Sequence, residues 1–332
     1  MLKKSLLEHR ASRVVAAFHV KYAFYLKPDR YRPVIGKEFR RFFYNFAGCV
    51  HNAVSETKRT CLNPPNLRLL YCPKKATVFT GNLFMDAAQI EQFRMDVYLV
   101  AERLITGDKL EYFVSVFDAL VERARSMTES VTSNWCLELD ADRKPIPGIL
   151  HKIQGVCLEE PRILDLARDP AIVQIAEALI GPDLDVFGTK FFPKLPRVGN
   201  STHWHQDNYY FSTHSDRVLS CGIYLQAADR ENGCLRIVPG SHLGEIADHE
   251  RDLDTYGSWA RVDESQAVDL EVPAGTVVLF SANLLHGARD NLTDRSRYST
   301  AWHYLPGGFN DLKYKRGEYK DRHPVSPHPA AL

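Results

Sequence analysis

The second half of the chain is a series of short apolar segments separated by turn-forming residues, and this pattern limits the fold more than any other feature. The segments after Gly181 are rich in β-branched and aromatic residues, and the turns between them include DRENG, VPAG and RDNLTDRS. Closely spaced short strands are typical of a sandwich or a barrel. We expect strands at 185–193, 202–211, 218–226, 234–240, 268–272, 275–281 and 297–305.

The region before these segments shows helical periodicity. We expect one helix over 86–105, capped by its first residue, and a second over 108–124 with its apolar residues in one stripe. A third has Asp169 as N-cap, Pro170 in its first turn and Gly181 as its stop. Helices followed by many short strands predict an α+β fold, a double-stranded β-helix (jelly roll) core with helices packed from the N-terminal side.

Basic residues are concentrated at the start of the chain. Residues 1–75 hold 16 of the 42 Lys and Arg residues but only 4 of the 41 Asp and Glu residues. Such a segment is either a solvated surface or a contact for an anionic membrane face or an acidic partner. The overall net charge of +1 gives no reason to expect nucleic acid. We expect a basic N-terminal extension or arm at 1–80, a jelly-roll domain at 81–310 and a C-terminal tail at 311–332.

The seven cysteines include no CxxC pair, which argues against a zinc ribbon or a disulfide framework and favours a reducing compartment. No apolar run approaches the roughly 18 residues of a membrane span. We therefore expect a cytoplasmic protein. The basic, acid-poor start of the chain leaves an organelle-targeting role as the alternative.

The stretch STHWHQDNYYF has two histidines and an aspartate at alternate positions, His203, His205 and Asp207. Side chains two apart on a strand point to the same face, so these three could converge on one point. Two histidines and one carboxylate on a metal leave three positions open, as in non-haem Fe(II) oxygenases. An HxD pair alone is a weak signal, and a surface His–Asp pair is the alternative.

Longer stretches carry a family resemblance: THWHQDNYYF, GIYLQAADRENGCLRIVPGSH and GTVVLFSANLLHGARDNLTDRSRYSTAWHYL. The order and spacing of HQD, ENG, PGSH and a distal histidine followed by an arginine resemble the phytanoyl-CoA dioxygenase family of Fe(II)/2-oxoglutarate-dependent oxygenases. The resemblance spans roughly residues 80–308. It implies a jelly-roll fold for this region, Fe(II) as cofactor, and 2-oxoglutarate and O2 as cosubstrates.

The family pattern implies a role for each candidate residue. His205 and Asp207 match the HxD ligands of the metal and His286 matches the distal histidine, which leaves His203 as a wall residue. Arg297, 11 residues after His286, matches the arginine that binds the distal carboxylate of 2-oxoglutarate. Its planar guanidinium with five donors suits bidentate recognition of a carboxylate.

Other cosubstrate contacts have alternatives. Arg295 competes with Arg297 if the strand begins early. Lys152 in HKIQG and Lys190 in GTKFF fall where the family has groups near the cosubstrate, although either could be a solvated surface lysine. Some members have a serine two residues after the distal histidine, where this chain has Ala288. That hydrogen bond is therefore missing here or comes from another residue.

The resemblance implies a dioxygenase that converts 2-oxoglutarate to succinate and CO2 while oxidising a small organic substrate, such as a lipid-like or biosynthetic intermediate. Related halogenating enzymes lack the carboxylate ligand, so the presence of Asp207 favours hydroxylation. Desaturation, epoxidation and cyclisation stay open, and so does the oligomeric state. Two other functions are a jelly-roll protein that binds a small ligand without turnover and a metal enzyme independent of 2-oxoglutarate.

Features near the expected pocket have two interpretations. The insertion 243–267 is either a substrate lid or a solvated surface loop. His242 in PGSH is expected to be a turn histidine bonded to backbone. Five aromatic residues either wall an apolar pocket or belong to the core: Tyr209, Tyr210, Phe211, Phe191 and Phe192.

Overall fold

The computed structural model describes residues 85, 87–129, 134–251 and 257–326, so the extension expected at 1–80 lies outside the described residues.

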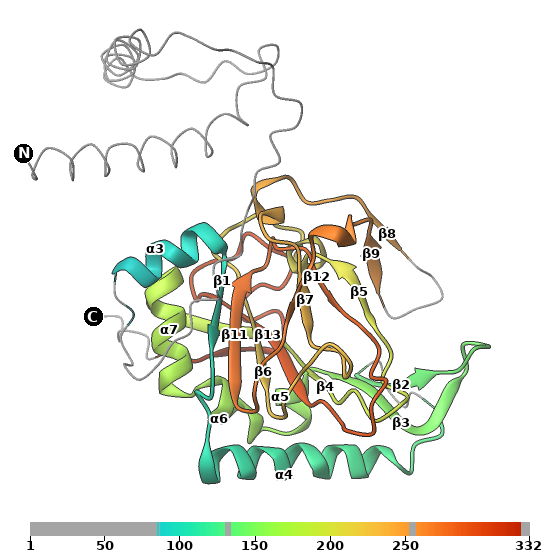
Figure 1. Ribbon diagram of the computed structural model, residues 1–332. Helices are drawn as coiled ribbons and strands as arrows, with labels where there is room; N and C mark the ends of the chain where they lie inside the picture. The colour runs from blue at the N-terminus through green and yellow to red at the C-terminus, as the bar shows by residue number, and fades with distance from the viewer. Residues whose placement is uncertain (1–84, 86, 130–133, 252–256, 327–332) are drawn as a thin grey trace, which may run out of the picture. The chain divides into compact units, whose positions relative to one another are not determined.

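Two antiparallel sheets form a jelly roll (Figure 1). In spatial order the larger sheet is β1 (Tyr98–Ala101), β11 (Thr276–Ser281), β6 (Leu219–Tyr224), β13 (Ser299–Pro306), β4 (Leu184–Phe192), β3 (Pro145–Gln154) and β2 (Trp135–Leu139), with β14 (Arg322–Pro324) also paired to β4. The smaller sheet is β10 (Val268–Leu270), β7 (Leu235–Ile237), β12 (His286–Ala288) and β5 (Thr202–His205). The predicted fold class is confirmed.

The longer helices cover the outer face of the larger sheet (Figure 1). Phe117 packs on Phe191 of β4 with ring centroids 4.4 Å apart. Along β11, Leu279 faces this helical layer and its neighbour Phe280 faces the smaller sheet, so the strand is buried on both faces. The helices are α3 (Ala87–Asp96), α4 (Gly107–Ala124), α5 (Val156–Glu159), α6 (Ile163–Ala167), α7 (Pro170–Ile180) and α8 (Asp207–Phe211).

Two of the three predicted helices are confirmed. Helix α4 matches the segment predicted over 108–124. Helix α7 begins after Asp169, whose side chain accepts a hydrogen bond from Ala171 N, and it ends at Gly181 in a positive-φ conformation. The prediction over 86–105 was wrong in its second half. The chain reverses at Val97, with φ 54°, and continues as β1, which pairs with β11.

One predicted strand was also wrong in its second half. The segment 202–211 is a strand only as far as His205, and Asp207 begins the short helix α8. This helix ends at Ser212, which adopts a left-handed conformation with φ 57°. The other six predicted strands are present as β4, β6, β7, β10, β11 and β13.

A bulge in β4 sets which of its side chains point inward. Pairing with β13 shifts by one residue between Phe187↔His303 and Lys190↔Ala301. Gly188 takes up the shift with φ 60°, a conformation that favours glycine. A Cβ atom at Gly188 would lie 3.3 Å from His303 Cδ2. The bulge therefore turns Lys190 toward the interior of the jelly roll.

The described part of the interval 311–332 includes β14, which pairs with β4. There Arg322 forms an ion pair with Asp185 at 2.9 Å, and both side chains are almost fully buried. None of the helices in the described part of the chain is both long and apolar enough to cross a membrane.

Candidate active site

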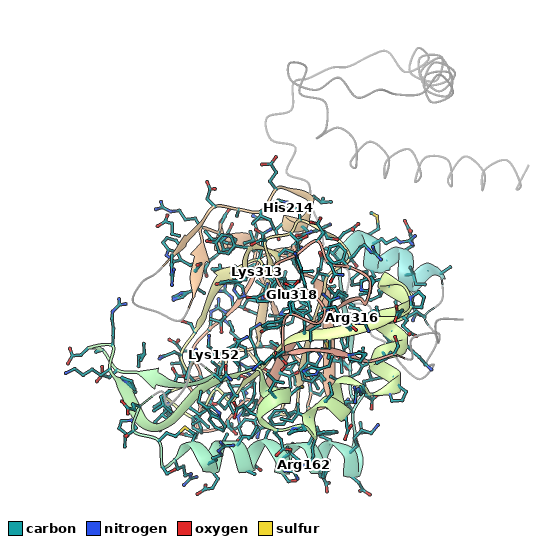
Figure 2. All side chains as sticks on the ribbon, turned by 180° about the vertical axis from the view of Figure 1, so that it is seen from behind. Lys152, Arg162, His214, Lys313, Arg316 and Glu318 are labelled. Atoms are coloured by element: carbon teal, nitrogen blue, oxygen red, sulfur yellow. The ribbon has the colours of Figure 1, made fainter. Side chains whose placement is uncertain are left out.

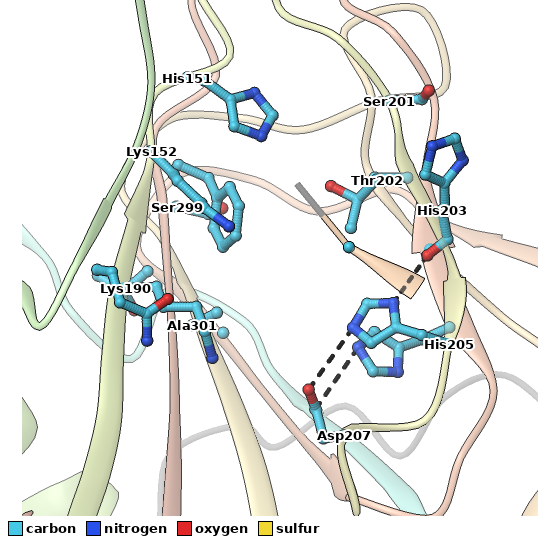
Figure 3. Close-up of a pocket in the computed structure, with 18 of the residues that line it drawn as sticks. His151, Lys152, Lys190, Ser201, Thr202, His203, His205, Asp207, Ser299 and Ala301 are labelled. Carbon is cyan, nitrogen blue, oxygen red and sulfur yellow. Dashed lines mark hydrogen bonds and ion pairs between the residues drawn. The ribbon is translucent and has the colours of Figure 1, made fainter. Parts of the chain in front are cut away.

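A cavity of about 970 Å³ lies between the two sheets. Strands β3, β4, β6 and β13 line one side of it, and β5 and β12 line the other. Figure 3 shows Lys152 and Lys190 on the wall formed by the larger sheet, opposite His203 and His205. Polar groups from both sheets therefore face the same space.

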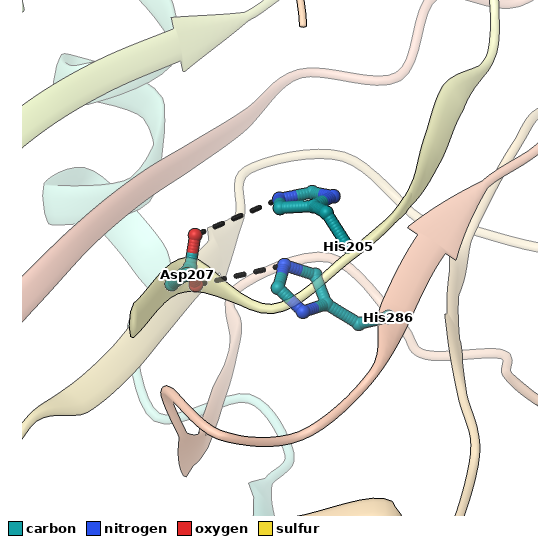
Figure 4. Close-up of side chains that lie close together, drawn as sticks. All are labelled: His205, Asp207 and His286. Atoms are coloured by element: carbon teal, nitrogen blue, oxygen red, sulfur yellow. Dashed lines mark ion pairs between the residues drawn. The ribbon is translucent and has the colours of Figure 1, made fainter. Parts of the chain in front are cut away.

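Three side chains that could bind a metal ion converge in this cavity. His205 and His286 lie directly opposite each other on the antiparallel strands β5 and β12. Because Gln206 is extended, the Asp207 side chain points the same way as that of His205. Asp207 Oδ1 lies 3.6 Å from His205 Nε2, and Oδ2 lies 3.6 Å from His286 Nε2 (Figure 4). The three ligand atoms lie within 4.8 Å of one another, a spacing that suits one metal ion.

Backbone carbonyls orient both imidazoles toward Asp207. His205 Nδ1 donates to the carbonyl oxygen of His203 at 2.7 Å, and His286 Nδ1 donates to that of Leu284 at 2.9 Å. Each ring therefore presents the lone pair of Nε2, the atom that binds a metal in such an arrangement. Burial, together with the nearby His205, lowers the pKa of His286 to about 4, so this ring is neutral near pH 7.

The carboxylate ligand is ionised despite its burial. Burial opposes the charged form of Asp207, but His303, His286 and His205 hold its pKa well below the usual value. Two imidazoles and an ionised carboxylate suit Fe(II), with three coordination positions left for other ligands.

Three buried or partly buried basic side chains line the same cavity. Arg297, 3% exposed, lies two residues before the start of β13, and its Nη1 donates to Ser299 Oγ. Lys190 on β4 and Lys152 on β3 are partly buried, and burial lowers the pKa of both amines. Arg295 instead lies on the surface, where its Nη2 pairs with Asp229 at 2.6 Å. Of the two arginines, only Arg297 reaches the cavity.

The basic wall fits a dianionic cosubstrate. Nε of Arg297 is buried and has no hydrogen-bond partner among the described residues. An unpaired buried donor on a cation is costly unless an anion binds there. Arg297 also lines the cavity, where its guanidinium can bind a carboxylate, so the side chains match 2-oxoglutarate in charge and in donor chemistry.

A hydrogen-bonded group that the sequence did not predict adjoins Asp207. Ser220 Oγ donates to Asp207 Oδ2 at 2.6 Å and lies 3.1 Å from His303 Nδ1. His303 Nε2 lies 3.3 Å from Lys190 Nζ. Ser220 and His303 are each 1% exposed. Burial lowers the pKa of His303 to about 3, so the ring is neutral.

A family model described as phytanoyl-CoA dioxygenase (PhyH) matches residues 93–299, more than half of the chain. The chain belongs to the phytanoyl-CoA dioxygenase family. The resemblance stated from HQD, PGSH and the distal histidine is therefore confirmed. The chain is an Fe(II)- and 2-oxoglutarate-dependent dioxygenase, an oxidoreductase that uses iron, 2-oxoglutarate and O2.

Individual relatives agree with this family. Peroxisomal phytanoyl-CoA dioxygenase of Rattus norvegicus is 24% identical over 260 residues, which cover 74% of each chain. Ectoine dioxygenase of Stutzerimonas stutzeri is 26% identical over 245 residues, or 67% of this chain and 78% of that one. The structure of EctD from S. alaskensis with 2-oxoglutarate and 5-hydroxyectoine is 20% identical, with a TM-score of 0.54 over 75% of this chain and 86% of that one. The last comparison shows the same fold.

The remaining histidines of the motif region lie apart from the metal-ligand group. His203 is exposed and lines the cavity, while its carbonyl orients His205. His242 lies in a short 3₁₀ turn, as expected, and its buried Nδ1 has no hydrogen-bond partner among the described residues.

The insertion 243–267 contains a hairpin of β8 (His249–Arg251) and β9 (Ser258–Ala260) beside the metal-ligand motif. His249 Nε2 accepts from Gln206 N at 3.0 Å, and Tyr210 Oη lies 2.8 Å from Ser258 N.

The expected aromatic residues divide between the two interpretations. Tyr210 and Phe192 line the cavity, Phe191 belongs to the core, Phe211 is buried and contributes to both, and Tyr209 is 37% exposed.

Proposed function

We propose that this dioxygenase hydroxylates a small, uncharged or cationic organic molecule in the cavity between the two sheets. His205, Asp207 and His286 would hold Fe(II), and Arg297 would anchor the distal carboxylate of 2-oxoglutarate. The observation that carries the proposal is the buried guanidinium of Arg297, which lines the same cavity as the three-ligand group and whose Nε has no hydrogen-bond partner in the described part of the chain. A binding-only pocket or a metal site independent of 2-oxoglutarate has no need for such a cation.

The bound iron would supply the redox chemistry, which couples decarboxylation of 2-oxoglutarate to oxidation of the substrate. The protein's side chains bind and orient the reactants. Retention of Asp207 fills the position that related halogenating enzymes leave for chloride, which favours hydroxylation. Lys152 and Lys190 would add positive charge beside the cosubstrate.

Some family members have a serine where this chain has Ala288, and we propose that Ser299 supplies the missing hydroxyl here. Ser299 lines the cavity, is 5% exposed and is bonded to Nη1 of Arg297. A hydroxyl can accept from the guanidinium and still donate to a carboxylate. We therefore propose that Arg297 and Ser299 together bind the distal carboxylate.

The rest of the cavity lining favours a substrate without phosphate groups. With the proposed metal ligands and the three cosubstrate-facing cations set aside, the charged lining residues are Glu138, Asp140, Asp290 and Arg143, a net negative set. Glu138 also holds His151, with its Oε2 3.0 Å from the Nδ1 of that ring. This wall suits hydroxyl or amine groups and disfavours the phosphates of coenzyme A.

We further propose a cytoplasmic enzyme that acts on a small molecule, with the basic segment 1–80 as an extension that could contact an anionic surface. The cysteines of the described residues, Cys136, Cys157, Cys221 and Cys234, are buried and form no disulfide with one another, which suits a reducing compartment.

Anaerobic titration with Fe(II) and 2-oxoglutarate tests the site. We expect a visible metal-to-ligand charge-transfer band that needs both additions and is absent in His205→Ala. Arg297→Lys should weaken 2-oxoglutarate binding about 10- to 100-fold, because a hydrogen bond to a charged group contributes about 1.5–3 kcal/mol. Arg295→Lys is the matched control and should leave the affinity unchanged.

The alternatives predict different results. If Arg297→Lys and Arg295→Lys bind 2-oxoglutarate equally well, the anchor assignment is wrong. A metal-loaded protein that forms no succinate with any substrate tested favours ligand binding without turnover. For the substrate class, neutral and cationic molecules should stimulate succinate formation more than their CoA thioesters, and stimulation by the thioesters alone would exclude our proposal.

A further inference from the structure

The larger sheet brings three polar side chains into consecutive contacts that end at Asp207. Ser220 comes from β6, His303 from β13 and Lys190 from β4, and all three line the cavity. The consecutive distances are 2.6 Å from Asp207 Oδ2 to Ser220 Oγ, 3.1 Å to His303 Nδ1 and, across the ring, 3.3 Å from His303 Nε2 to Lys190 Nζ. The contacts form one continuous path from a lysine to a metal-ligating carboxylate.

The chemistry of these groups fixes the direction of every hydrogen bond. An ionised carboxylate only accepts, so Ser220 must donate its hydroxyl proton to Asp207. The Ser220 oxygen must then accept from His303 Nδ1, and an ammonium group can only donate, so Lys190 donates to Nε2. A single neutral tautomer of His303 satisfies both contacts. All three donors therefore point toward the carboxylate.

The local packing is built to hold His303 in this position. Its ring lies between Phe187 and Phe211, with centroid distances of 5.3 Å and 4.6 Å. The bulge at Gly188 leaves room for the ring edge and turns Lys190 inward, where Nζ also donates to the carbonyl oxygen of Gly188 at 3.2 Å. The path therefore depends on the irregular part of β4.

We propose that Ser220 and His303 are positioning residues that orient Asp207 for metal binding and couple it to Lys190, the lysine proposed to lie beside the cosubstrate. The inference rests on the metal assignment of the proposed function. The Ser220 hydroxyl occupies Oδ2, which leaves Oδ1 as the oxygen with fewer competing contacts for an ion. Partners of this kind orient a ligand and tune its basicity, and their loss typically costs about 10- to 100-fold in metal affinity.

The contact between His303 and Lys190 has a second consequence. An anion bound by Lys190 changes the hydrogen bond that Lys190 donates to His303, which belongs to the same path that orients Asp207. Metal and 2-oxoglutarate binding therefore reinforce each other partly through His303, in addition to any direct contact between them. Such coupling is reciprocal, so it can be measured from the side of the metal.

The test is a titration of metal-free protein with Co(II), followed by visible absorption, with and without 2-oxoglutarate. Ser220→Ala should raise the Co(II) dissociation constant about 10- to 100-fold and change the ligand-field spectrum. Ser220→Thr, which keeps the hydroxyl, should restore both. Ser326→Ala is the matched control, because it removes a hydroxyl of similar burial (5% exposed) that accepts from Leu184 N instead.

His303→Phe provides an independent variant, since the two flanking phenylalanines suit an apolar ring. It should weaken Co(II) binding in the same direction and reduce the gain that 2-oxoglutarate gives. The double variant, Ser220→Ala with His303→Phe, should bind Co(II) about as tightly as the single variant that binds it less tightly, because both substitutions interrupt the same path. Fully additive losses would overturn the continuous path.

The outcomes separate this inference from the function on which it rests. If native protein binds neither Co(II) nor Fe(II), the metal assignment itself fails. If native protein binds Co(II) but Ser220→Ala binds it equally well and with the same spectrum, only the positioning role fails. Thermal unfolding of each variant shows whether a loss reflects the site or the fold.

Discussion

The two sheets of this jelly roll are buried to different degrees and carry different parts of the chemistry. In the larger sheet, β6 and β11 are buried along their entire lengths between the helices and the interior. In the smaller sheet, β7 is fully buried and β12 mostly so, but β5 has no buried residue and β10 has one. The smaller sheet supplies both histidines of the metal-ligand group, while the larger sheet supplies Lys152, Lys190 and the path behind Asp207.

The larger sheet therefore contributes most of the buried core, and the smaller sheet contributes the two histidines of the proposed metal site. The larger sheet gains the most from burial and can hold buried cations in fixed positions. The smaller sheet supplies the two histidines that face Asp207. Substitutions on the helix-facing side of the larger sheet should therefore affect mainly unfolding, and substitutions of the two histidines on the smaller sheet should affect mainly metal binding.

The largest expected effect lies between the helical layer and the larger sheet. Phe117→Ala empties a fully buried ring site against Phe191, and such changes cost about 3–5 kcal/mol. Urea unfolding should show this loss, while Co(II) affinity of the folded protein stays unchanged. Leu292→Ala, at a side chain that is 66% exposed, should change stability by less than about 0.5 kcal/mol. Equal losses in the two variants would contradict the contrast.

The second effect has the opposite pattern. His286→Ala removes a ligand of the proposed metal site on the smaller sheet and should lower Fe(II) or Co(II) affinity by more than about 100-fold, the upper range for loss of a mere supporting group. The unfolding midpoint of the metal-free protein should change little. Figure 2 shows the exposed His214 at the edge of the molecule, and His214→Ala is the control. Retained metal binding in His286→Ala would exclude this histidine as a ligand.

A third variant tests the bulge in β4, which we expect to affect both the stability of the larger sheet and metal binding. Gly188→Ala places a side chain at φ 60° and 3.3 Å from the His303 ring. Left-handed backbone costs about 1–2 kcal/mol for other residues, and displacement of the ring should also weaken Co(II) binding. Gly181→Ala is the control, since Gly181 has φ 94° but a Cβ atom added there would meet nothing within 4 Å. If both variants leave metal binding intact, the bulge has only a structural role.

The sequence predicted the regular parts of this fold better than its irregular parts. Alternating or continuous apolar runs predicted six strands of the jelly roll, and the capping residue Asp169 located α7. Strand β1 was missed because its four apolar residues also continue a helical period. Only the observed pairing with β11 shows that burial on two faces outweighs that period.

The site shows the same limit. His205, Asp207 and His286 came from a motif, and the structure brings them together. Ser220 and His303 have no motif, and on a strand they resemble ordinary polar positions. The isolated glycine in FGTKFF was a usable signal, because a glycine within a strand pattern indicates a bulge or a close approach. Which side chain approaches it depends on pairing between segments more than 100 residues apart.

The smallest effect concerns a lysine that ties the two sheets together. Lys194 follows β4, and its Nζ donates to the carbonyl oxygens of Asn200, before β5, and Arg289, after β12. Burial, with the nearby Arg297, lowers the pKa of Lys194 to about 7. An unfolded lysine titrates near about 10.4, so between these values the unfolded chain binds more protons. This group therefore makes the free energy of unfolding rise with pH above about 7, by at most about 1.4 kcal/mol per pH unit.

Lys194→Met isolates that contribution. Urea unfolding at pH 7, 8 and 9 should show a smaller rise for the variant than for native protein, because the variant has no amine to deprotonate on folding. Lys313→Met, at an exposed lysine, is the control and should keep the native pH slope. Parallel slopes for native protein and Lys194→Met would mean that Lys194 stays charged in the fold. The two sheets would then be joined by a buried ammonium group, and Arg297 would face a second full positive charge that strengthens the demand for an anion in the cavity.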